Sequence, residues 1–530
     1  MATNDMSDRK SASKETSSGP ANNKPSESAT TTKKPKSYKS SSAFAKLSAQ
    51  GLPSEQADTL TWVFDCCISL AGRIPFTIDK LDPSARVEAT EFNEKLAQYD
   101  RICGFVWPSS WHAKSCPVDS SLTRARDLLF EQAEEIQAAP LAPNSGPLTL
   151  EHQRWFEEHM SALLYTSAGS FTRDIMQGRR PGINVKEAES RHDFDALLFH
   201  FYAQDQEDGS PYVLLEQSIR FARNELVELA DPKSVAEAHQ TQLEKDRSLC
   251  MQASQAAEDS YGPAMLISQQ ALITETQAEK FYQQFNTILK HPDKVRKLVE
   301  ARSRQEPRSG ICDVLLFYPI QPRLMGDAVA EFMISPKDSN KPPKTVSRDA
   351  NKRFLQNPFH VSTTEMSGVS TVTELWTRPD FAGKLLLPHF VAEYKKPSYD
   401  EGRALNQGRM YLASLVAFYS ALGIEEHPFY CLVTSGKLGA ILMAYRSSTQ
   451  KQSYLVERNV RIFDISVPIQ AFQFASFLLR LRDDQQELKE RIEKRLKKGL
   501  TDMDQERLRK WSKYAQMNET PPEVVETSEN

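Results

Sequence analysis

The spacing of apolar and polar residues changes near residue 306. Before that point, apolar residues recur every three to four positions, the period of an amphipathic helix. The segments with this spacing are 122–138, 148–176, 211–230 and 274–303. Proline and glycine residues occupy the connections, as at Pro140, Gly146 and Gly209. The pattern therefore predicts that residues 46–305 form a mainly helical region.

After residue 306 the pattern is that of short strands around one long helix. Apolar runs of strand length occupy 311–318, 371–381, 390–395, 428–435 and 438–445. A helix is expected over 402–422, where Gly423 is suited to end it. Two further short strands, 453–456 and 460–465, precede two helices over 469–482 and 485–498. Strands wrapped around a buried helix predict an α/β domain at 306–500.

The two ends of the chain differ in composition from the rest. Residues 1–45 are rich in Ser, Thr, Lys, Asn and Pro, so we expect a disordered tail. Residues 501–530 are expected to hold a helical end and a disordered acidic tail. The cluster Lys33-Lys34-Pro35-Lys36 has three interpretations: a nuclear-import signal, a weak phosphate contact, or a solvated tail.

Overall composition narrows the class of protein. Among the 530 residues, 39% are hydrophobic and the formal net charge is −4, which argues against a surface coated in positive charge. A local basic groove remains compatible with this balance. Seven irregularly spaced cysteines and a polar N-terminus favour an intracellular, reducing compartment. The longest uncharged apolar run, 410–424, is shorter than the roughly 20 residues of a membrane helix, so we expect no membrane partner.

Chemistry-bearing residues gather in two of the predicted strands. Asp380 lies at the end of one strand, and Glu393 and Lys395 lie two positions apart in the next. Because side chains alternate along a strand, Glu393 and Lys395 share a face while Tyr394 points to the other. A short connection would bring Asp380 beside Glu393.

Two carboxylates and a lysine on one face suit hydrolysis of a phosphodiester. Asp380 and Glu393 would hold Mg²⁺ or Mn²⁺ through oxygen atoms, with the Tyr394 carbonyl as a possible third ligand. The metal would lower the pKa of a bound water. Lys395 would orient that water or stabilise charge on the phosphate oxygens.

The helix that follows adds a second pattern. Gln407 and Tyr411 are four residues apart and share a helix face. Pro379-Asp380, Glu393-x-Lys395 and this helix together resemble the PD-(D/E)XK nuclease superfamily, in its phage-exonuclease and RecB-like branch. The resemblance covers about 75 residues. The chain is also similar to fungal proteins with such a domain near the C-terminus.

The resemblance implies a restriction-endonuclease-like core, a Mg²⁺-dependent nuclease activity and a nucleic-acid substrate, with DNA favoured over RNA. In that branch the Gln supports the active site and the Tyr packs beside it, which gives Gln407 and Tyr411 supporting roles. The alternative function is a catalytically inactive nuclease-like fold that serves as a nucleic-acid or protein interaction module. The partner of the helical half stays open.

Several residues stay open at this point. The family's upstream acidic ligand has no clear counterpart, and the candidates are Glu216, Glu225, Glu228, Glu331 and Glu374. Arg403 and Arg409 flank the active-site helix and could contact phosphates or be solvated. Cys103, His112 and Cys116 lack the paired short spacings of a zinc site. The acidic segment at 192–195 is interpreted as a helix start.

Overall fold

The computed structural model describes residues 66–78, 81–112, 116–138, 146–179, 187–202, 212–220, 309–320, 385–395, 401–449 and 452–498, with single positions and short pieces elsewhere between 62 and 507. The predicted tail at 1–45, the acidic end of the chain and the predicted strand at 371–381 lie outside these residues. No helix in the described part is long and apolar enough to cross a membrane.

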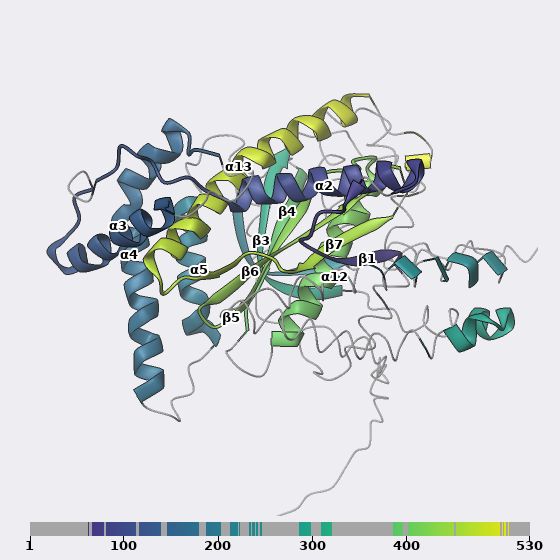
Figure 1. The fold of residues 1–530 in the computed structure, drawn as a ribbon, viewed down its shortest axis with the longest axis horizontal. Helices are drawn as coiled ribbons and strands as arrows, with labels where there is room; N and C mark the ends of the chain where they lie inside the picture. The colour runs from purple at the N-terminus through teal and green to yellow at the C-terminus, as the bar shows by residue number, and fades with distance from the viewer. Residues whose placement is uncertain are drawn as a thin grey trace, which may run out of the picture. The chain divides into compact units, whose positions relative to one another are not determined.

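A mixed β-sheet forms the centre of the described chain (Figure 1). Seven of its strands follow the order β1-β7-β6-β5-β4-β3-β2, and β8 pairs with β6. The strands are β1 (Ile68–Gly72), β2 (Tyr212–Arg220), β3 (Ser309–Ile320), β4 (Leu385–Glu393), β5 (Phe429–Ser435), β6 (Leu438–Arg446), β7 (Ser453–Arg458) and β8 (Ile462–Asp464). The expected mixture of helices and strands is confirmed.

The sheet combines antiparallel and parallel pairs. β2, β3 and β4 are antiparallel neighbours, and β5 pairs with β4 in parallel. The parallel pair needs a crossover, and helix α12 (Glu401–Ala421) supplies it, as the sequence predicts. β5 returns as β6 through a tight turn in which Gly436 has a φ of +61°. The predicted strands at 428–435 and 438–445 are thus confirmed.

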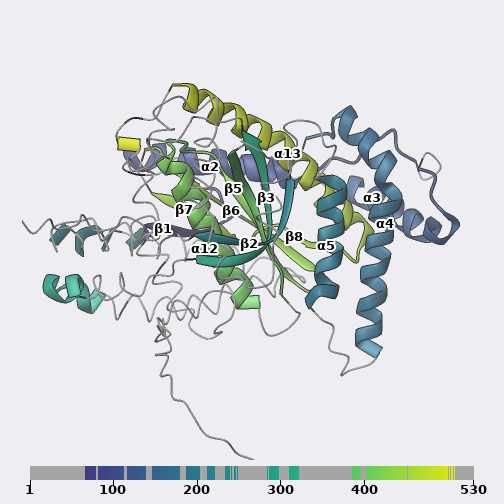
Figure 2. The same cartoon turned by 180° about the vertical axis from the view of Figure 1, so that it is seen from behind.

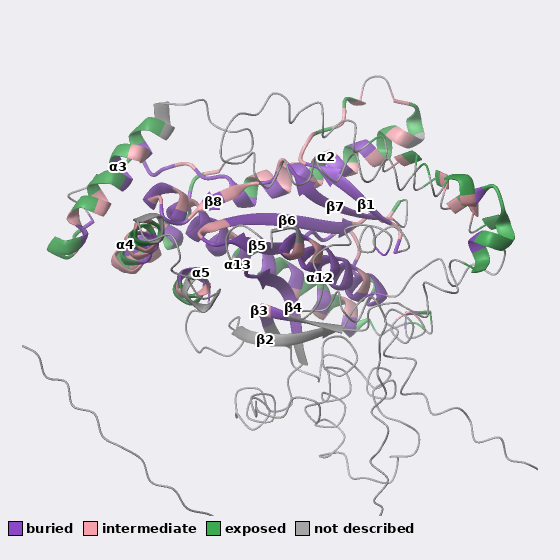
Figure 3. Ribbon diagram, turned by 90° about the horizontal axis from the view of Figure 1, so that it is seen from below, coloured by how far each residue is buried: buried purple, intermediate pink, exposed green. Residues whose placement is uncertain are grey.

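Helices cover both faces of the sheet. On one face, Gly408 of α12 packs against β5 and β6. On the other face lie α2 (Pro83–Cys103) and α13 (Pro468–Lys497), where Tyr99 and Phe477 both contact the Tyr430 ring of β5. Figures 2 and 3 show the sheet enclosed between these layers. The residues of β5, β6 and β7 are accordingly buried almost throughout.

The helical part of the chain docks on α13. Helices α3 (Thr123–Ala138), α4 (Leu150–Arg179) and α5 (Glu187–Phe201) all contact it. The predicted helices at 122–138 and 148–176 are confirmed. The described residues belong to one compact unit, in which β1 and β2 from before residue 306 join the sheet. The change of pattern at residue 306 therefore does not separate two sheets.

Two predicted helical segments are wrong in detail. The helix expected over 211–230 is strand β2 at Tyr212–Arg220, because its aromatic and β-branched residues pair with β3 about 100 residues away. The two helices expected at the C-terminus are the single helix α13. Asp483 and Asp484 do not interrupt it, since Asp484 is buried and accepts a hydrogen bond from Gln98 at 2.9 Å.

Candidate functional site

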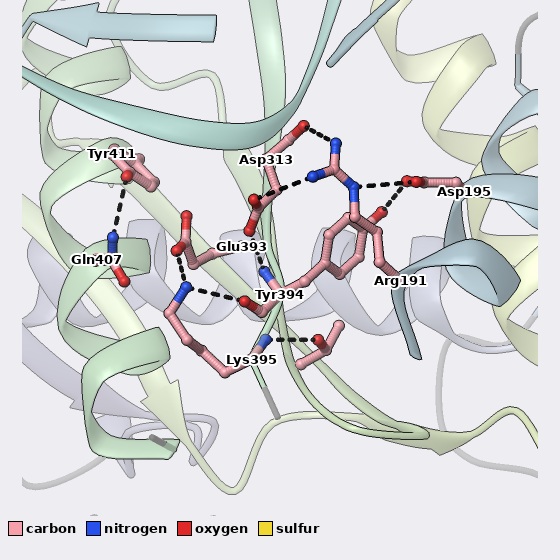
Figure 4. A network of polar contacts seen from close by, with 9 residues as sticks. Arg191, Asp195, Asp313, Glu393, Tyr394, Lys395, Gln407 and Tyr411 are labelled. Atoms are coloured by element: carbon pink, nitrogen blue, oxygen red, sulfur yellow. Dashed lines mark hydrogen bonds and ion pairs between the residues drawn. The ribbon is translucent and has the colours of Figure 1, made fainter. Parts of the chain in front are cut away.

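The carboxyl end of β4 carries the predicted Glu-x-Lys pair. Glu393 and Lys395 are 2% and 8% exposed, so both charges are buried. Lys395 Nζ forms an ion pair with Glu393 Oε1 and also donates to the Tyr394 carbonyl oxygen at 2.9 Å. Figure 4 shows this pair facing Gln407 and Tyr411 of α12. The ion pair agrees with the prediction that the side chains of Glu393 and Lys395 lie on the same side of the chain.

Helix α12 places a polar pair next to Glu393. Gln407 Nε2 donates to the Tyr411 hydroxyl at 3.5 Å, and both side chains are buried. Burial raises the pKa of Tyr411 well above its usual value, and the charge of Glu393 adds to the effect. The phenol therefore stays protonated. Gln407 Oε1 is a buried acceptor that has no hydrogen-bond partner among the described residues.

Asp313 of β3 is the carboxylate that lies across from Glu393. Val314 pairs with Ala392 in the antiparallel ladder, so Asp313 occupies the next position, opposite Glu393. Its Oδ2 accepts a hydrogen bond from the Tyr394 backbone amide at 2.7 Å. The sequence analysis missed Asp313. Its one signal is an acidic residue inside the apolar run at 311–318.

Tyr394 connects the site to helix α5 on the opposite face of β4. Its side chain is 1% exposed, its ring stacks on Phe194, and its hydroxyl donates to Asp195 Oδ1 at 2.8 Å. Burial, and then the nearby Asp195 carboxylate, raise the Tyr394 pKa. The prediction of a helix start at 192–195 is wrong, because α5 begins at Glu187. Asp195 instead lies within the helix and contacts the strand.

The remaining predicted acids divide into two groups. Asp380, Glu225, Glu228, Glu331 and Glu374 lie outside the described residues. Both edges of β4 are occupied, by β3 and β5, so the antiparallel neighbour of the Glu393 strand is β3 rather than the expected segment 371–381. Residue 216 belongs to β2. The pairs Leu215–Val314 and Gln217–Cys312 place it opposite Asp313 in the register.

Two other expectations concern charges and cysteines. Arg409 is fully buried and forms a two-point ion pair with Glu457, so neither alternative, a phosphate contact or a solvated side chain, describes this residue. Arg403 is half-buried near the start of α12. Cys103 and Cys116 are buried thiols. Within the described ranges, no three His, Cys, Asp or Glu side chains gather closely enough to hold a metal ion.

Comparisons of the chain with protein-family models, with curated proteins and with solved structures found no match. The case for a function therefore depends on the geometry of the site.

The donor set at this site consists of hard oxygen atoms. The carboxylates of Asp313 and Glu393 flank the strand end, and the Gln407 amide oxygen faces Lys395 in Figure 4. Hard oxygen ligands suit Mg²⁺ or Mn²⁺ better than zinc. Mg²⁺ is commonly held by one or two carboxylates together with waters and substrate phosphates. Two carboxylates, and an amide oxygen that has no hydrogen-bond partner among the described residues, are donors of the kind that such an ion takes.

Proposed function

We propose that this chain is a metal-dependent nuclease-like protein that hydrolyses phosphodiester bonds, with DNA favoured as the substrate. The observation that carries the proposal is the buried Glu393–Lys395 pair at the end of β4, with Asp313 across from it. The order of elements supports it. An antiparallel strand pair, the crossover helix α12 and a parallel strand follow one another as a restriction-endonuclease-like core requires.

The location of the site supports the same function. The site lies where the parallel strands β4 and β5 end and where α12 begins. Ligands of open α/β sheets bind outside the carboxyl ends of the strands. The partial positive charge of the α12 N-terminus also favours an anionic group at this place. A phosphate of the nucleic-acid backbone has that charge.

Each residue has a role that follows from its contacts. When bound, Mg²⁺ would lower the pKa of a water and neutralise charge on the phosphate. Asp313 and Glu393 would hold that ion, with the Tyr394 carbonyl as a further oxygen. Lys395 would stabilise charge that develops on the phosphate oxygens, and in the structure it neutralises Glu393. Gln407 would orient a water or a phosphate from α12.

The first carboxylate of the motif is assigned to Asp313 in this proposal. Asp380 is the residue that follows proline in the sequence pattern, whereas Asp313 is the one opposite Glu393 in the sheet. Residue 216 of β2 is opposite Asp313, so positions 216, 313 and 393 lie in one row across β2, β3 and β4. Of the candidates for the upstream acid, Glu216 is the one whose backbone position lies in this row.

The alternative is an inactive nuclease-like module that binds nucleic acid or protein. One observation favours it: Arg191 pairs with Asp313 and Lys395 pairs with Glu393, so both carboxylates are neutralised within the chain. An active site must exchange these internal partners for a metal ion. An inactive module would retain them.

A cleavage assay distinguishes the two functions. Purified full-length protein is incubated with linear and circular DNA and with RNA, in Mg²⁺, in Mn²⁺ or in EDTA. We expect metal-dependent cleavage that Lys395→Met, Glu393→Gln and Asp313→Asn each reduce at least 100-fold. Lys494→Ala, on the exposed end of α13, is the matched control and should leave cleavage unchanged.

The same assay decides the assignment of the acids. If Asp380→Asn abolishes cleavage and Asp313→Asn does not, the sequence pattern is correct and Asp313 is structural. If wild-type protein binds DNA in a mobility-shift assay without cutting it in either metal, the alternative holds. Cleavage that survives Lys395→Met and Glu393→Gln rejects this site altogether.

A further inference from the structure

Helix α5 places two opposite charges one turn apart behind the Glu393 strand. Arg191 Nε donates to Asp195 Oδ2 at 3.2 Å, and the Tyr394 hydroxyl donates to Asp195 Oδ1 at 2.8 Å. The Arg191 guanidinium also lies over the Tyr394 ring, at 5.7 Å from its centroid. Figure 4 shows this group on the side of β4 away from Gln407 and Tyr411.

The same guanidinium reaches β3. Arg191 Nη1 donates to Asp313 Oδ1 at 3.4 Å, and Nη2 donates to the Asp313 carbonyl oxygen at 3.1 Å. Arg191 is therefore shared between two carboxylates: one on its own helix, and one that faces Glu393 in the sheet. The second Asp313 oxygen is held by the Tyr394 amide, so α5 and β4 together orient this carboxylate.

We propose that Arg191 and Asp195 are positioning residues that set the effective charge of the Asp313 carboxylate and, through it, the affinity of the site for a divalent cation. This inference rests on the proposed function. Arg191 attracts the same oxygen atoms that a cation would use, so it weakens cation binding while it orients the carboxylate. Asp195 attracts the guanidinium toward α5 and so reduces the extent to which Arg191 neutralises the Asp313 carboxylate.

The size of the expected change in cation affinity follows from how deeply these charged side chains are buried. The side chains of Arg191, Asp195 and Asp313 are between 15% and 18% exposed, so their interactions are less screened than those of surface pairs. A nearby buried charge of this kind changes cation affinity by about threefold to tenfold. An arginine that only orients the Asp313 carboxylate would change cation affinity differently. Its loss would weaken cation binding whether the replacing side chain is charged or neutral.

Direct titration of Mn²⁺ into the full chain, by calorimetry and by electron paramagnetic resonance, tests the inference without any substrate. Arg191→Lys keeps the charge and loses the two-point geometry, whereas Arg191→Gln loses both. We expect Arg191→Gln to bind Mn²⁺ about threefold to tenfold more tightly than Arg191→Lys. We expect Asp195→Asn to bind it more weakly than wild type by a similar factor.

The matched control is Arg173→Gln. Arg173 of α4 pairs with Asp193, another acid of α5, so this variant removes an equivalent arginine that pairs elsewhere on the helix. Its Mn²⁺ affinity should equal that of wild type. Thermal unfolding of every variant shows whether it is folded.

The possible outcomes separate the two proposals. Opposite shifts for the Arg191 and Asp195 variants, with an unchanged control, support the inference. Wild type that binds Mn²⁺, together with equal affinities for Arg191→Gln and Arg191→Lys, overturns the inference alone. Wild type that does not bind Mn²⁺ overturns both this inference and the proposed function.

Discussion

The Asp313 carboxylate accepts a 2.7 Å hydrogen bond from the backbone amide of Tyr394. A side chain thus takes the place of a backbone partner where the β3–β4 ladder ends. The bond joins the residue between Glu393 and Lys395 to the only acid described opposite them. Any movement of β3 would therefore displace the Glu-x-Lys pair as well.

Gly408 allows α12 to approach β5 closely. A Cβ atom at this position would lie 2.5 Å from Val433 Cγ1 and 3.2 Å from Leu442 Cδ1. We expect Gly408→Ala to lower the free energy of unfolding by about 1–3 kcal/mol, because overpacking exceeds the gain in helix propensity. Urea denaturation measures this, and Val433→Ala in the same chain should recover part of the loss. A stabilised Gly408→Ala protein would contradict the close contact.

Arg409 and Glu457 form an ion pair whose side chains are fully buried. Arg409→Met leaves a buried carboxylate without its partner and should cost about 3–5 kcal/mol in the free energy of unfolding. The double variant Arg409→Met/Glu457→Met should be more stable than Arg409→Met alone, because the stranded charge is gone. Guanidinium denaturation of the three proteins gives the comparison. A double variant that is no more stable than Arg409→Met would contradict this account of the pair.

His389 is buried and has two hydrogen-bond partners. Gln485 Nε2 lies 2.7 Å from Nδ1, and the Tyr202 hydroxyl lies against Nε2 while donating to Gln485 Oε1. All three hydrogen bonds of this cycle can form if Nδ1 accepts and Nε2 donates. That arrangement is a neutral tautomer of the imidazole. Burial lowers the His389 pKa well below its usual value, and nearby His427 adds to this.

This environment predicts a pH dependence of stability. The unfolded chain takes up the proton near pH 6.5 and the folded chain does not, so stability is lost as pH falls below that value. One such proton contributes a slope of up to about 1.4 kcal/mol per pH unit. Denaturation at pH 7, 6 and 5 should show a smaller slope for His389→Gln than for wild type. Equal slopes would mean that His389 titrates normally in the folded protein.

Phe472 joins α13 to the helical part of the chain. Its ring stacks on Phe156 of α4 at 4.1 Å between centroids, and the centroid of the Trp107 ring lies 4.8 Å from that of Phe472. We expect Phe472→Ala to cost about 3–5 kcal/mol, whereas Phe171→Ala, at an exposed position of α4, should change stability little.

The Phe472 cluster also predicts cooperative unfolding. Of the six tryptophans whose fluorescence would be measured, Trp107 and Trp111 lie in the cluster. Circular dichroism reports on helices throughout the chain. The two signals should change together in denaturant, because β1, β2 and α13 connect both halves of the sequence. Two separated transitions would indicate that the helical part unfolds independently.

The local chemistry of the site could be predicted from the sequence. Strand alternation places Glu393 and Lys395 on one face, and helical spacing places Gln407 above Tyr411, because both periods are properties of the backbone. The helix α12 and the strands β5 and β6 follow from the same local patterns and are found where they were expected.

What only the tertiary structure decided is which distant segments meet. β2 has a helix-like spacing of apolar residues, yet pairing with β3 makes it a strand. Arg191 carries no local signal, and the signal of Asp313 is limited to an acidic residue inside an apolar run. Both reach the site because β3 pairs with β4 and α5 covers its other face. Sequence patterns report contacts within a few residues. The pairing of β2 with β3 and of β3 with β4 joins residues that are about 65 to 105 positions apart, so it depends on the whole core. By itself, the sequence therefore determined the Glu393–Lys395 pair, and the fold determined the acid that faces it.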